Sequence, residues 1–380
     1  MKLKSRAYVL YRLPYQEQAT YIEQSKTEPE YFKSVVHLNG KEGFVFAPFS
    51  PSQKQPVVLI HPEVMRTVDV MELEECDNWL KKCPKKLRKQ EMEMQTWLNQ
   101  EEKKRYDKSF ESFHQQLTEG SFTKLVLSRT STLYHRLDEC PYPSQFMPLK
   151  GWYELLFMKA CRMYPRMFVA LIDDNEAGTW LMATPELLLK GEKNDFSTMS
   201  LAGTQKATAA HSQNDDPIEA VEWSEKNQEE QQLVTNYIEG CIKRFTEECS
   251  LKGPFTTVAG NLYHLRTDIH FLLRDSDHLG DFLKALYPTP AVCGIPKKEA
   301  CEFIKKNEIG YRDYYSGFAG ILAPQAGTQL YVSLRCASLC TNFAKLYAGG
   351  GLLKESEKEK EWDETEAKLQ TIKAVFSLTE

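Results

Sequence analysis

Hydrophobic positions along this chain repeat with two different periods, and each period predicts its own elements. Apolar runs and alternations of strand length occupy residues 7–11, 34–38, 56–60, 122–134, 167–173, 178–190 and 195–201. Asn39-Gly40 is a hairpin signal, and Asp173 to Glu176 forms a second tight turn, so much of the sheet is expected to be antiparallel. Helices are expected at 152–163, 216–246, 278–286, 297–307 and 357–377, and across the charged segment from about 70 to 118. Strands and helices in long blocks predict an α+β fold.

The composition is that of an ordinary globular protein. Of 380 residues, 42% are hydrophobic and 27% are charged, which is enough for a large core. A formal net charge of −5 gives no basic footprint for nucleic acid or for an anionic membrane surface. No apolar run reaches the roughly 18 residues that span a bilayer. Because the N-terminus also has no signal-peptide core, we expect a cytoplasmic protein.

The cysteines predict thiols rather than cross-links. There are ten, and they are scattered without a CxxC pair. Several of them lie in apolar surroundings, namely Cys161, Cys241, Cys293 and Cys336. We therefore expect buried reduced thiols instead of a disulfide framework or a zinc site.

The C-terminal helix places charge on its inward face. At about 100° per residue, Glu361, Glu364 and Lys368 fall within roughly 60° of one another. The apolar positions that point the same way are Leu369, Ile372, Val375 and Phe376. Desolvating a carboxylate is costly unless it is paired or bound to a metal, so this face suggests a binding site; the alternative is a solvated first turn whose acids suit the helix dipole. Just before the helix, Gly349-Gly350-Gly351 permits close backbone approach and offers N–H groups to an anion.

Two more ionisable residues interrupt apolar strands. Lys124 shares a strand face with Phe122 and Val126. It either reaches solvent from a sheet edge or lies beside a cavity where burial lowers its pKa, as a general base requires. Glu186 follows Pro185 between apolar residues. It is either an acidic turn residue or a carboxyl whose pKa is raised by its apolar surroundings, as a general acid requires.

Four further positions carry polar groups in apolar contexts. The small-residue turn Ala202-Gly203-Thr204 could expose backbone N–H groups and a hydroxyl to a ligand. Glu230 lies on the apolar face of a helix, His264 in a strand-like segment, and Arg335 on the polar face of an alternating strand. A guanidinium suits bidentate binding of a carboxylate. The ordinary alternatives are a satisfied core histidine at 264 and an exposed sheet face at 335.

The order of these groups resembles that of the chorismate-utilising enzymes. The resemblance covers roughly residues 115–377 and is densest at Thr123-Lys-Leu-Val-Leu-Ser-Arg129, Ser200-Leu-Ala-Gly-Thr204, Tyr287–Gly294 with Pro296-Lys297, Tyr315-Ser-Gly317, and Tyr347–Gly351 continued by Glu361, Glu364 and Lys368. It implies two packed, largely antiparallel β-sheets with helices on the outside, in a single domain over 1–380 with its core region at 116–377. Residues 1–115 match poorly, and we expect them to supply strands of the same domain and charged helices that cover it.

Within the family, the chain is most similar to the isochorismate synthases. Lys124 stands where members that add ammonia have glutamine and members that add water have lysine. Ala202 stands where aminodeoxychorismate synthases have a lysine nucleophile, and Ala291 where salicylate synthases tend to have threonine. These positions imply addition of water at C2 of chorismate, loss of the C4 hydroxyl, and release of isochorismate for menaquinone or siderophore biosynthesis.

The resemblance also implies a role for each site residue. Lys124 would activate the water, and Glu186 would protonate the departing hydroxyl. Mg²⁺ would be held by Glu230 and Glu364, with Glu361 binding its waters. The substrate-binding residues implied are Ala202, Gly203, Thr204, His264, Ala291, Tyr315, Arg335, Gly349 and Lys368.

One motif departs from the family pattern. Between Lys226 and Gln231 the family usually has Lys-Glu-x-x-Glu-His, whereas here Asn227 and Gln231 replace the first acid and the histidine, which leaves one outer metal contact in question. Three other functions stay open: a salicylate synthase, an amidotransferase synthase subunit, and a catalytically silent binding protein that uses the charged segment 70–118. The expected partners are chorismate and isochorismate, with no nucleic acid and no membrane, for a monomer or alternatively a dimer.

Overall fold

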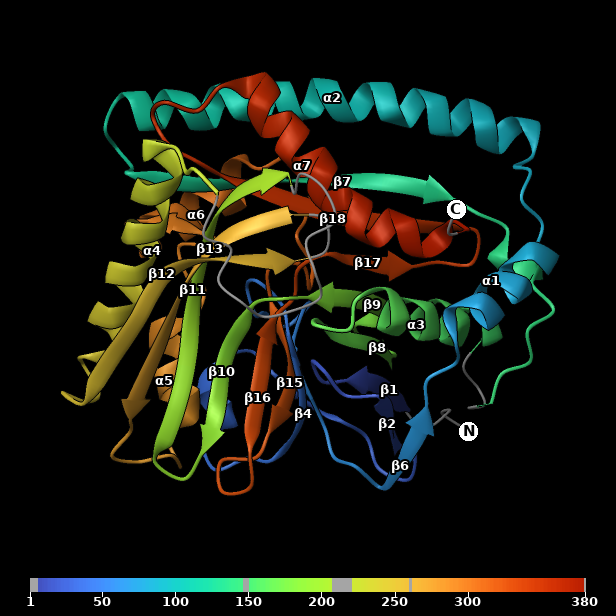
Figure 1. The fold of residues 1–380 in the computed structure, drawn as a ribbon, viewed down its shortest axis with the longest axis horizontal. Coiled ribbons are helices and arrows are strands. Elements are labelled where there is room, and N and C mark those ends of the chain that lie inside the picture. Colours follow the sequence, from blue (N-terminus) through green and yellow to red (C-terminus); the bar gives the residue numbers. More distant parts are fainter. Residues whose placement is uncertain (1–5, 146–149, 207–220, 260–261, 379–380) are drawn as a thin grey trace.

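Two antiparallel sheets form the centre of the computed structural model, which describes residues 6–145, 150–206, 221–259 and 262–378. Within these residues each sheet has nine strands, and the neighbouring strands pair in antiparallel register. In Figure 1 the strands of one sheet run across the right half of the view, while those of the other run more steeply at the lower left. The predicted α+β architecture of two packed sheets with helices outside is confirmed.

Residues from the N-terminal segment contribute strands to both sheets. The first sheet contains, in spatial order, β14 (Gly294–Ile295), β7 (Lys124–Tyr134), β18 (Phe343–Leu352), β17 (Cys336–Leu339), β9 (Gly178–Thr184), β8 (Phe168–Asp174), β1 (Ala7–Arg12), β2 (Gln18–Gln24) and β6 (Val64–Asp69). The second contains β12 (Cys249–Ala259), β13 (Leu262–Leu272), β11 (Asp195–Lys206), β10 (Leu187–Glu192), β16 (Thr328–Val332), β15 (Phe318–Leu322), β4 (Gly43–Ala47), β5 (Val57–Ile60) and β3 (Glu30–Phe32).

Alternation along the strands divides the core into layers. In β1, Ala7, Val9 and Tyr11 pack between the two sheets, whereas Tyr8 and Leu10 face the helices on the outside. Strand β5 is buried at all of its positions, because one face meets the other sheet and the opposite face is covered by helices. An apolar run without polar alternation therefore marks a strand that is covered on both faces.

Helices cover the outer faces of both sheets (Figure 1). The α-helices are α1 (Leu73–Lys82), α2 (Lys89–Thr118), α3 (Gly151–Met163), α4 (Glu225–Ile242), α5 (Leu279–Leu286), α6 (Lys297–Asn307) and α7 (Lys358–Lys373), and short 3₁₀ helices occupy Val35–Leu38, Leu137–Glu139 and Ala374–Phe376. Helices α1, α3 and α7 pack on the first sheet, α4 and α5 on the second, and α2 and α6 beside β7. Among the described helices, none has the length and apolar character needed to cross a membrane.

The long charged helix α2 protects an edge of the first sheet. Strand β14 pairs with the first two residues of β7, and side chains of α2 reach the backbone of β7 beyond that point. Glu102 accepts a hydrogen bond from the N–H of Thr132, while Gln95 accepts one from the N–H of Tyr134 and donates one to the carbonyl of Thr132. An open edge strand would invite pairing with another chain, so these contacts give the charged segment a structural role.

Three sequence predictions of secondary structure are corrected. Residues 34–38 are not a strand: Ser34 Oγ accepts a hydrogen bond from the N–H of Val36 and caps a 3₁₀ helix, because a short hydroxyl side chain competes with strand pairing for the backbone. Asn39-Gly40 links this helix to β4 and closes no hairpin. The helix predicted at 216–246 is α4, which begins after its cap Ser224; residues 207–220 lie outside the described part of the chain.

One cysteine pair also differs from expectation. Cys83, which ends α1, forms a disulfide with Cys140, 57 residues later. No local pattern encodes this pairing, because the two residues follow separate helices. The four cysteines predicted to be buried free thiols, Cys161, Cys241, Cys293 and Cys336, are confirmed.

Candidate active site

A partly enclosed cavity lies beside α7, between strands of both sheets and α4. Its walls come from β7, β18, β11 and β13, from α4 and α7, and from the loops that precede β10 and β17. Every predicted site residue except Lys124 and Glu361 lines it: Glu186, Ala202, Gly203, Thr204, Glu230, His264, Ala291, Tyr315, Arg335, Gly349, Glu364 and Lys368. Residues from distant parts of the sequence are thus brought to one place.

Lys124, at the start of β7, is fully buried and faces Glu230 on α4. Its Nζ lies 2.8 Å from Glu230 Oε1, but Nζ makes no hydrogen bond of good geometry with the described residues. Gly351 on β18 makes room for the pair, because a Cβ there would collide with Glu230 Oε1 and lie 2.8 Å from Lys124 Cε. The close approach predicted for the glycine run is therefore confirmed at Gly351, and Lys124 keeps hydrogen-bonding capacity for a small polar molecule.

Glu186, in the break between β9 and β10, is a buried carboxyl in the cavity wall. Its backbone is held by a hydrogen bond from the N–H of Val332 to its carbonyl. Burial raises the pKa of its carboxyl to about 7, although the positive charges of Lys124, Lys368 and Arg335 oppose the shift. Near neutral pH a large fraction of this group is protonated and able to donate a proton.

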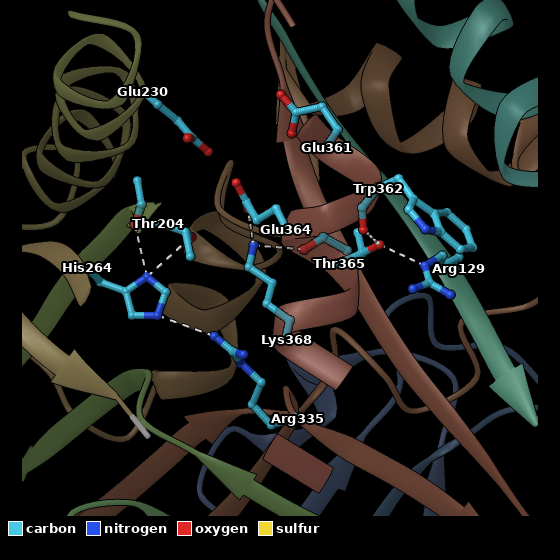
Figure 2. Close-up of polar contacts among 12 residues, drawn as sticks. Arg129, Thr204, Glu230, His264, Arg335, Glu361, Trp362, Glu364, Thr365 and Lys368 are labelled. Atoms are coloured by element: carbon cyan, nitrogen blue, oxygen red, sulfur yellow. Dashed lines mark hydrogen bonds and ion pairs between the residues drawn. The ribbon is translucent and has the colours of Figure 1, made fainter. Parts of the chain in front are cut away.

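His264, on β13, is a neutral imidazole that connects two parts of the wall (Figure 2). Burial, followed by the positive charges of Arg335 and Lys368, lowers its pKa to about 3. Nδ1 lies 2.9 Å from the carbonyl oxygen of Gly203, to which it donates, so Nε2 accepts from Arg335 Nη2 at 3.3 Å. The side chain of Thr204 lies 3.4 Å from Nδ1. His264 thereby fixes the guanidinium to the Ala-Gly-Thr turn rather than carrying charge itself.

Arg335 is a buried guanidinium that no described carboxylate reaches as an ion pair. Its hydrogen bonds go to His264 and, at 3.5 Å from Nη1, to Thr371 Oγ1. Burial lowers its pKa to about 10, and its backbone is left-handed, with φ +47°. A non-glycine residue in that conformation costs about 1–3 kcal/mol. A strained, buried cation without an anionic partner, facing a cavity, is the arrangement expected for binding an anionic ligand.

Tyr315 completes the wall beside Arg335. Its ring stacks on Tyr347 with centroids 5.6 Å apart. Burial raises the pKa of its phenol, so the hydroxyl keeps its proton. The hydroxyl lies 2.7 Å from where a Cβ of Gly349 would be, so only glycine permits this approach. The hydroxyl of Tyr315 and the backbone of Gly349 are therefore neighbours, as their joint assignment to one ligand group requires.

Helix α7 presents two charged residues to the cavity (Figure 2). Lys368 Nζ donates to the carbonyl of Gly349 at 2.9 Å and to Glu364 Oε1 at 2.6 Å. Burial by itself would raise the pKa of Glu364, but the charge and hydrogen bond of Lys368 hold it below its usual range. Glu364 is therefore an ionised carboxylate at neutral pH.

Glu361 lies one turn earlier on α7 and outside the cavity lining. It is almost completely buried and accepts a hydrogen bond from Lys226 of α4. Burial and the negative charge of Glu364 raise its pKa, although Lys226 opposes the shift. Its second oxygen, Oε2, makes no hydrogen bond in the described residues.

Arg129 fixes α7 against β7 on the side away from the cavity (Figure 2). Its Nε donates to Thr365 Oγ1 at 2.7 Å, and its guanidinium stacks on Trp362, 3.8 Å from the ring centroid. It also pairs with Glu366. These contacts set the rotation of α7 and with it the direction of Glu361 and Glu364.

The donor chemistry fits a divalent cation, although no cluster is preassembled. In the described part of the chain, no three carboxylate, imidazole or thiol side chains already stand at metal-binding spacing. Glu230, Glu361 and Glu364 each lie beside a lysine instead. A Cβ on Gly350 would be 3.4 Å from Glu361 Oε2 and 3.6 Å from Glu364 Oε1, so both oxygens border the same backbone segment. A hard cation would satisfy Oε2 and relieve the repulsion between these carboxylates.

Sequence reasoning missed some contributors to the site. Lys226 belongs to the motif that departs from the family pattern. It is the ion-pair partner of Glu361, a contact that exists only because α7 approaches α4. Asn227, in the same motif, lies against Gly203. Gln231 is buried and donates to Ser200 Oγ at 2.9 Å and to Thr267 Oγ1 at 3.1 Å. Gln231 therefore ties α4 to the second sheet, and its side chain hydrogen-bonds away from the carboxylates.

Comparisons with known proteins show which family and which folds this chain is similar to. The family model described as chorismate binding enzyme matches residues 57–377. Isochorismate synthase EntC of Escherichia coli K12 is 29% identical over 204 residues, which cover 53% of this chain and 52% of the relative. The chain therefore spans about half the length of this curated relative. The structure of DhbC from Bacillus anthracis superposes with a TM-score of 0.75 at 22% identity, covering 100% of this chain and 98% of that one. For MenF, the menaquinone-specific isochorismate synthase of Escherichia coli, the TM-score is 0.73 at 20% identity, with coverage of 99% and 90%.

Proposed function

Because the chain belongs to the family of chorismate binding enzymes, we propose that its cavity converts chorismate to isochorismate. One observation carries the proposal. Glu186, a buried carboxyl whose pKa is about 7, shares the cavity with the buried and unpaired cation Arg335. The first group supplies a proton to a leaving hydroxyl, and the second supplies charge for a carboxylate of the substrate.

Arg335 and Tyr315 would bind the carboxylate of the enolpyruvyl side chain, with the N–H of Gly349 beside them. Lys368 and the Gly203-Thr204 turn would orient the rest of the molecule. His264 is neutral, so it can accept the hydrogen bond of the Arg335 guanidinium without repelling it. Ala202 and Ala291 would present small side chains to the bound ring, since both line the cavity.

Two proton transfers complete the reaction. Lys124 would take a proton from the water that attacks C2, which requires its amino group to be neutral when the water arrives. Glu186 would give its proton to the C4 hydroxyl, which leaves as water. One proton is taken up and one is released, so the isomerisation needs no redox partner and is reversible.

Mg²⁺ belongs to the proposal because chorismate is a dianion and the site already holds carboxylates. Glu230 and Glu364 would hold the cation, and Glu361 would act through its bound water. Bound there, Mg²⁺ would neutralise negative charge next to the ring carboxylate. The unpartnered Oε2 of Glu361 supports this assignment.

The decisive experiment is incubation of the purified chain with chorismate and Mg²⁺, followed by chromatography of the products. Isochorismate as the main product is expected. Salicylate with pyruvate would replace the proposal with a salicylate synthase, and anthranilate formed with ammonia would remove Lys124 as the base. Chorismate that binds but stays unchanged would indicate a binding protein.

The proposal extends to the setting of the reaction. We expect a monomer acting in the cytoplasm, with isochorismate passing to menaquinone or siderophore biosynthesis. Light scattering of the purified chain measures the first point, and a dimer mass would contradict it. Deletion of the gene followed by growth tests with menaquinone or with a siderophore would distinguish the two routes.

A further inference from the structure

A second reactive pair lies behind the cavity wall. Cys293 is completely buried just before β14, and Cys301 is half-buried in the first turns of α6. Their Sγ atoms are 2.9 Å apart, close enough to share a hydrogen bond. Neither thiol has a role in the proposed reaction. Two free thiols already held in contact need only a small movement to reach the bonded S–S distance of about 2.05 Å.

The half-buried thiol opens onto a positively charged groove. Cys301 lines it together with residues from α4, α5 and the segment after β4. The basic side chains of this groove are Lys33, Arg244, Lys284, Lys297, Lys298 and Lys305, against the acidic Asp281 and Glu302. Such an excess of positive charge attracts small anions to the side of the pair that solvent reaches.

The two thiols are electrostatically unequal. A hydrogen bond from Cys293, followed by the charges of Lys297, Lys305 and Arg312, lowers the pKa of Cys301 to about 7 although burial opposes the shift. The same contact and burial raise the pKa of Cys293. Near neutral pH the accessible sulfur is therefore ionised more readily than the buried one, which is the order needed for an attacking and a resolving thiol.

We propose that Cys301 is a site of thiol–disulfide exchange with small anionic disulfides such as glutathione disulfide, and that Cys293 resolves the mixed disulfide. The Cys301 thiolate attacks one sulfur of the disulfide, forms a mixed disulfide and releases one glutathione thiolate. Cys293 then loses its proton and attacks the sulfur of Cys301, which releases the second glutathione. The two protein thiols are oxidised to one disulfide, and the glutathione disulfide is reduced to two thiols.

The pair is connected to the cavity through the backbone. The carbonyl of Cys293 accepts a hydrogen bond at 2.7 Å from the N–H of Val126, two residues after Lys124. Ala291 and Val292, immediately before Cys293, line the cavity. Formation of the bond would pull this segment towards α6. We therefore expect oxidation to slow turnover of chorismate, a consequence that rests on the proposed function, whereas the exchange itself does not.

The test is mass spectrometry of the full chain, reduced, freed of reductant, treated with glutathione disulfide and then alkylated. The wild-type chain should lose two hydrogens through a Cys293–Cys301 bond, which peptide mapping distinguishes from the re-formed Cys83–Cys140 disulfide. Cys293→Ser should instead accumulate one glutathionyl group on Cys301, and Cys301→Ser should form neither product. Cys249 is a matched control, since it is also half-buried but burial raises the pKa of its thiol. We expect Cys301 to react about tenfold faster or more at pH 7.

A separate pair of substitutions tests the role of the positive charge in the groove. Replacing Lys33 and Lys298 with glutamine should slow exchange with glutathione disulfide several-fold and leave exchange with the neutral 2-hydroxyethyl disulfide unchanged, because the charges that lower the pKa of Cys301 are those of Lys297, Lys305 and Arg312. Equal slowing with both reagents would overturn the preference for anionic disulfides. If Cys301 reacted no faster than Cys249, or if Cys293→Ser gave no adduct, the exchange site itself would be overturned.

Discussion

Two lysines of this protein have the same burial and the same ion-pair distance, yet only one is paired with a residue that lines the candidate active-site cavity. Lys124 lies 2.8 Å from Glu230, and Lys159 on α3 lies 2.8 Å from Asp77 on α1; both lysine side chains are completely buried. Lys159 also donates to the backbone carbonyl of Ser377. Lys124 makes no hydrogen bond of good geometry in the described residues and lies within the electrostatic reach of Glu186.

The difference shows that burial and pairing do not by themselves make a lysine reactive. The Lys159 pair joins two helices to the C-terminal segment, and its hydrogen bonds contribute to the stability of that layer. Lys124 is equally buried, but its amino group remains available to hydrogen-bond a ligand. A buried amino group that lacks hydrogen-bond partners destabilises the fold. Its presence therefore favours a functional role.

The strongest test of this contrast replaces the structural lysine. Lys159→Met should reduce the free energy of unfolding by about 3–5 kcal/mol, because Asp77 loses its cation inside the core. Chemical denaturation measures the loss, and turnover per folded molecule should stay close to wild type. The double variant Lys159→Met/Asp77→Leu should regain much of the stability. A loss below about 1 kcal/mol for the single variant would contradict the assigned role.

The same substitution at Lys124 should have the opposite effect, with a large loss of activity and a smaller loss of stability. Lys124→Met should lower kcat for chorismate conversion at least about a hundredfold, the usual scale of general base catalysis. Its unfolding free energy should change less than that of Lys159→Met, because Glu230 keeps access to the cavity. Near-normal kcat would assign water activation to another group.

The acid partner extends the comparison to pH. In the proposed mechanism Glu186 acts in its protonated form, so its contribution to activity should fall as pH rises through about 7. Glu186→Gln should remove that limb together with at least about a hundredfold of kcat. The stability of the fold should change with pH in the same direction. The raised pKa of the Glu186 carboxyl contributes stability that is fully present below the pKa of the unfolded chain, near 4.5, and that is lost as pH rises through 7. Denaturation of Glu186→Gln should therefore depend less on pH between these values, and an unchanged pH profile would contradict the assignment.

The dependence on Mg²⁺ is a further test that distinguishes the cavity from the Lys159 pair. EDTA should abolish turnover and Mg²⁺ should restore it. Glu361→Gln should weaken Mg²⁺ binding, measured by calorimetry, about 10–100-fold, as loss of an outer-shell partner does. The fold should tolerate this change, because the variant removes a buried carboxylate that Glu364 repels. Full turnover in EDTA would refute the metal site, and Lys159→Met should bind Mg²⁺ normally.

The smallest expected effect concerns the product. Ala291 lines the cavity, and Ala291→Thr should raise the share of salicylate without abolishing isochorismate formation. Chromatography after incubation with chorismate gives the ratio, with Val292→Thr as a neighbouring control. An unchanged ratio would remove Ala291 from product selection.

Local sequence patterns predicted the individual site residues better than the contacts between separate elements. The inward charge on α7 follows from helical period, and Lys124 and Glu186 break apolar runs, so each could be predicted from its immediate neighbours. The contacts of Glu230 with Lys124 and of Lys226 with Glu361 join separate elements, so no such pattern encodes them. Residues 34–38 misled the strand prediction because the cap formed by Ser34 outweighed their β-branched composition.

The position of α7 in the chain has a consequence for biosynthesis. In the described chain, every strand and every other α-helix precedes α7 in sequence, yet α7 brings Glu364 and Lys368 to the cavity. During translation, earlier segments leave the ribosome and begin to fold first. Both sheets can therefore assemble on the ribosome before the acidic side of the cavity exists. A nascent chain halted before α7 emerges would be a folded scaffold without the proposed chorismate turnover, so under the proposal synthesis itself delays the appearance of activity until the helix docks.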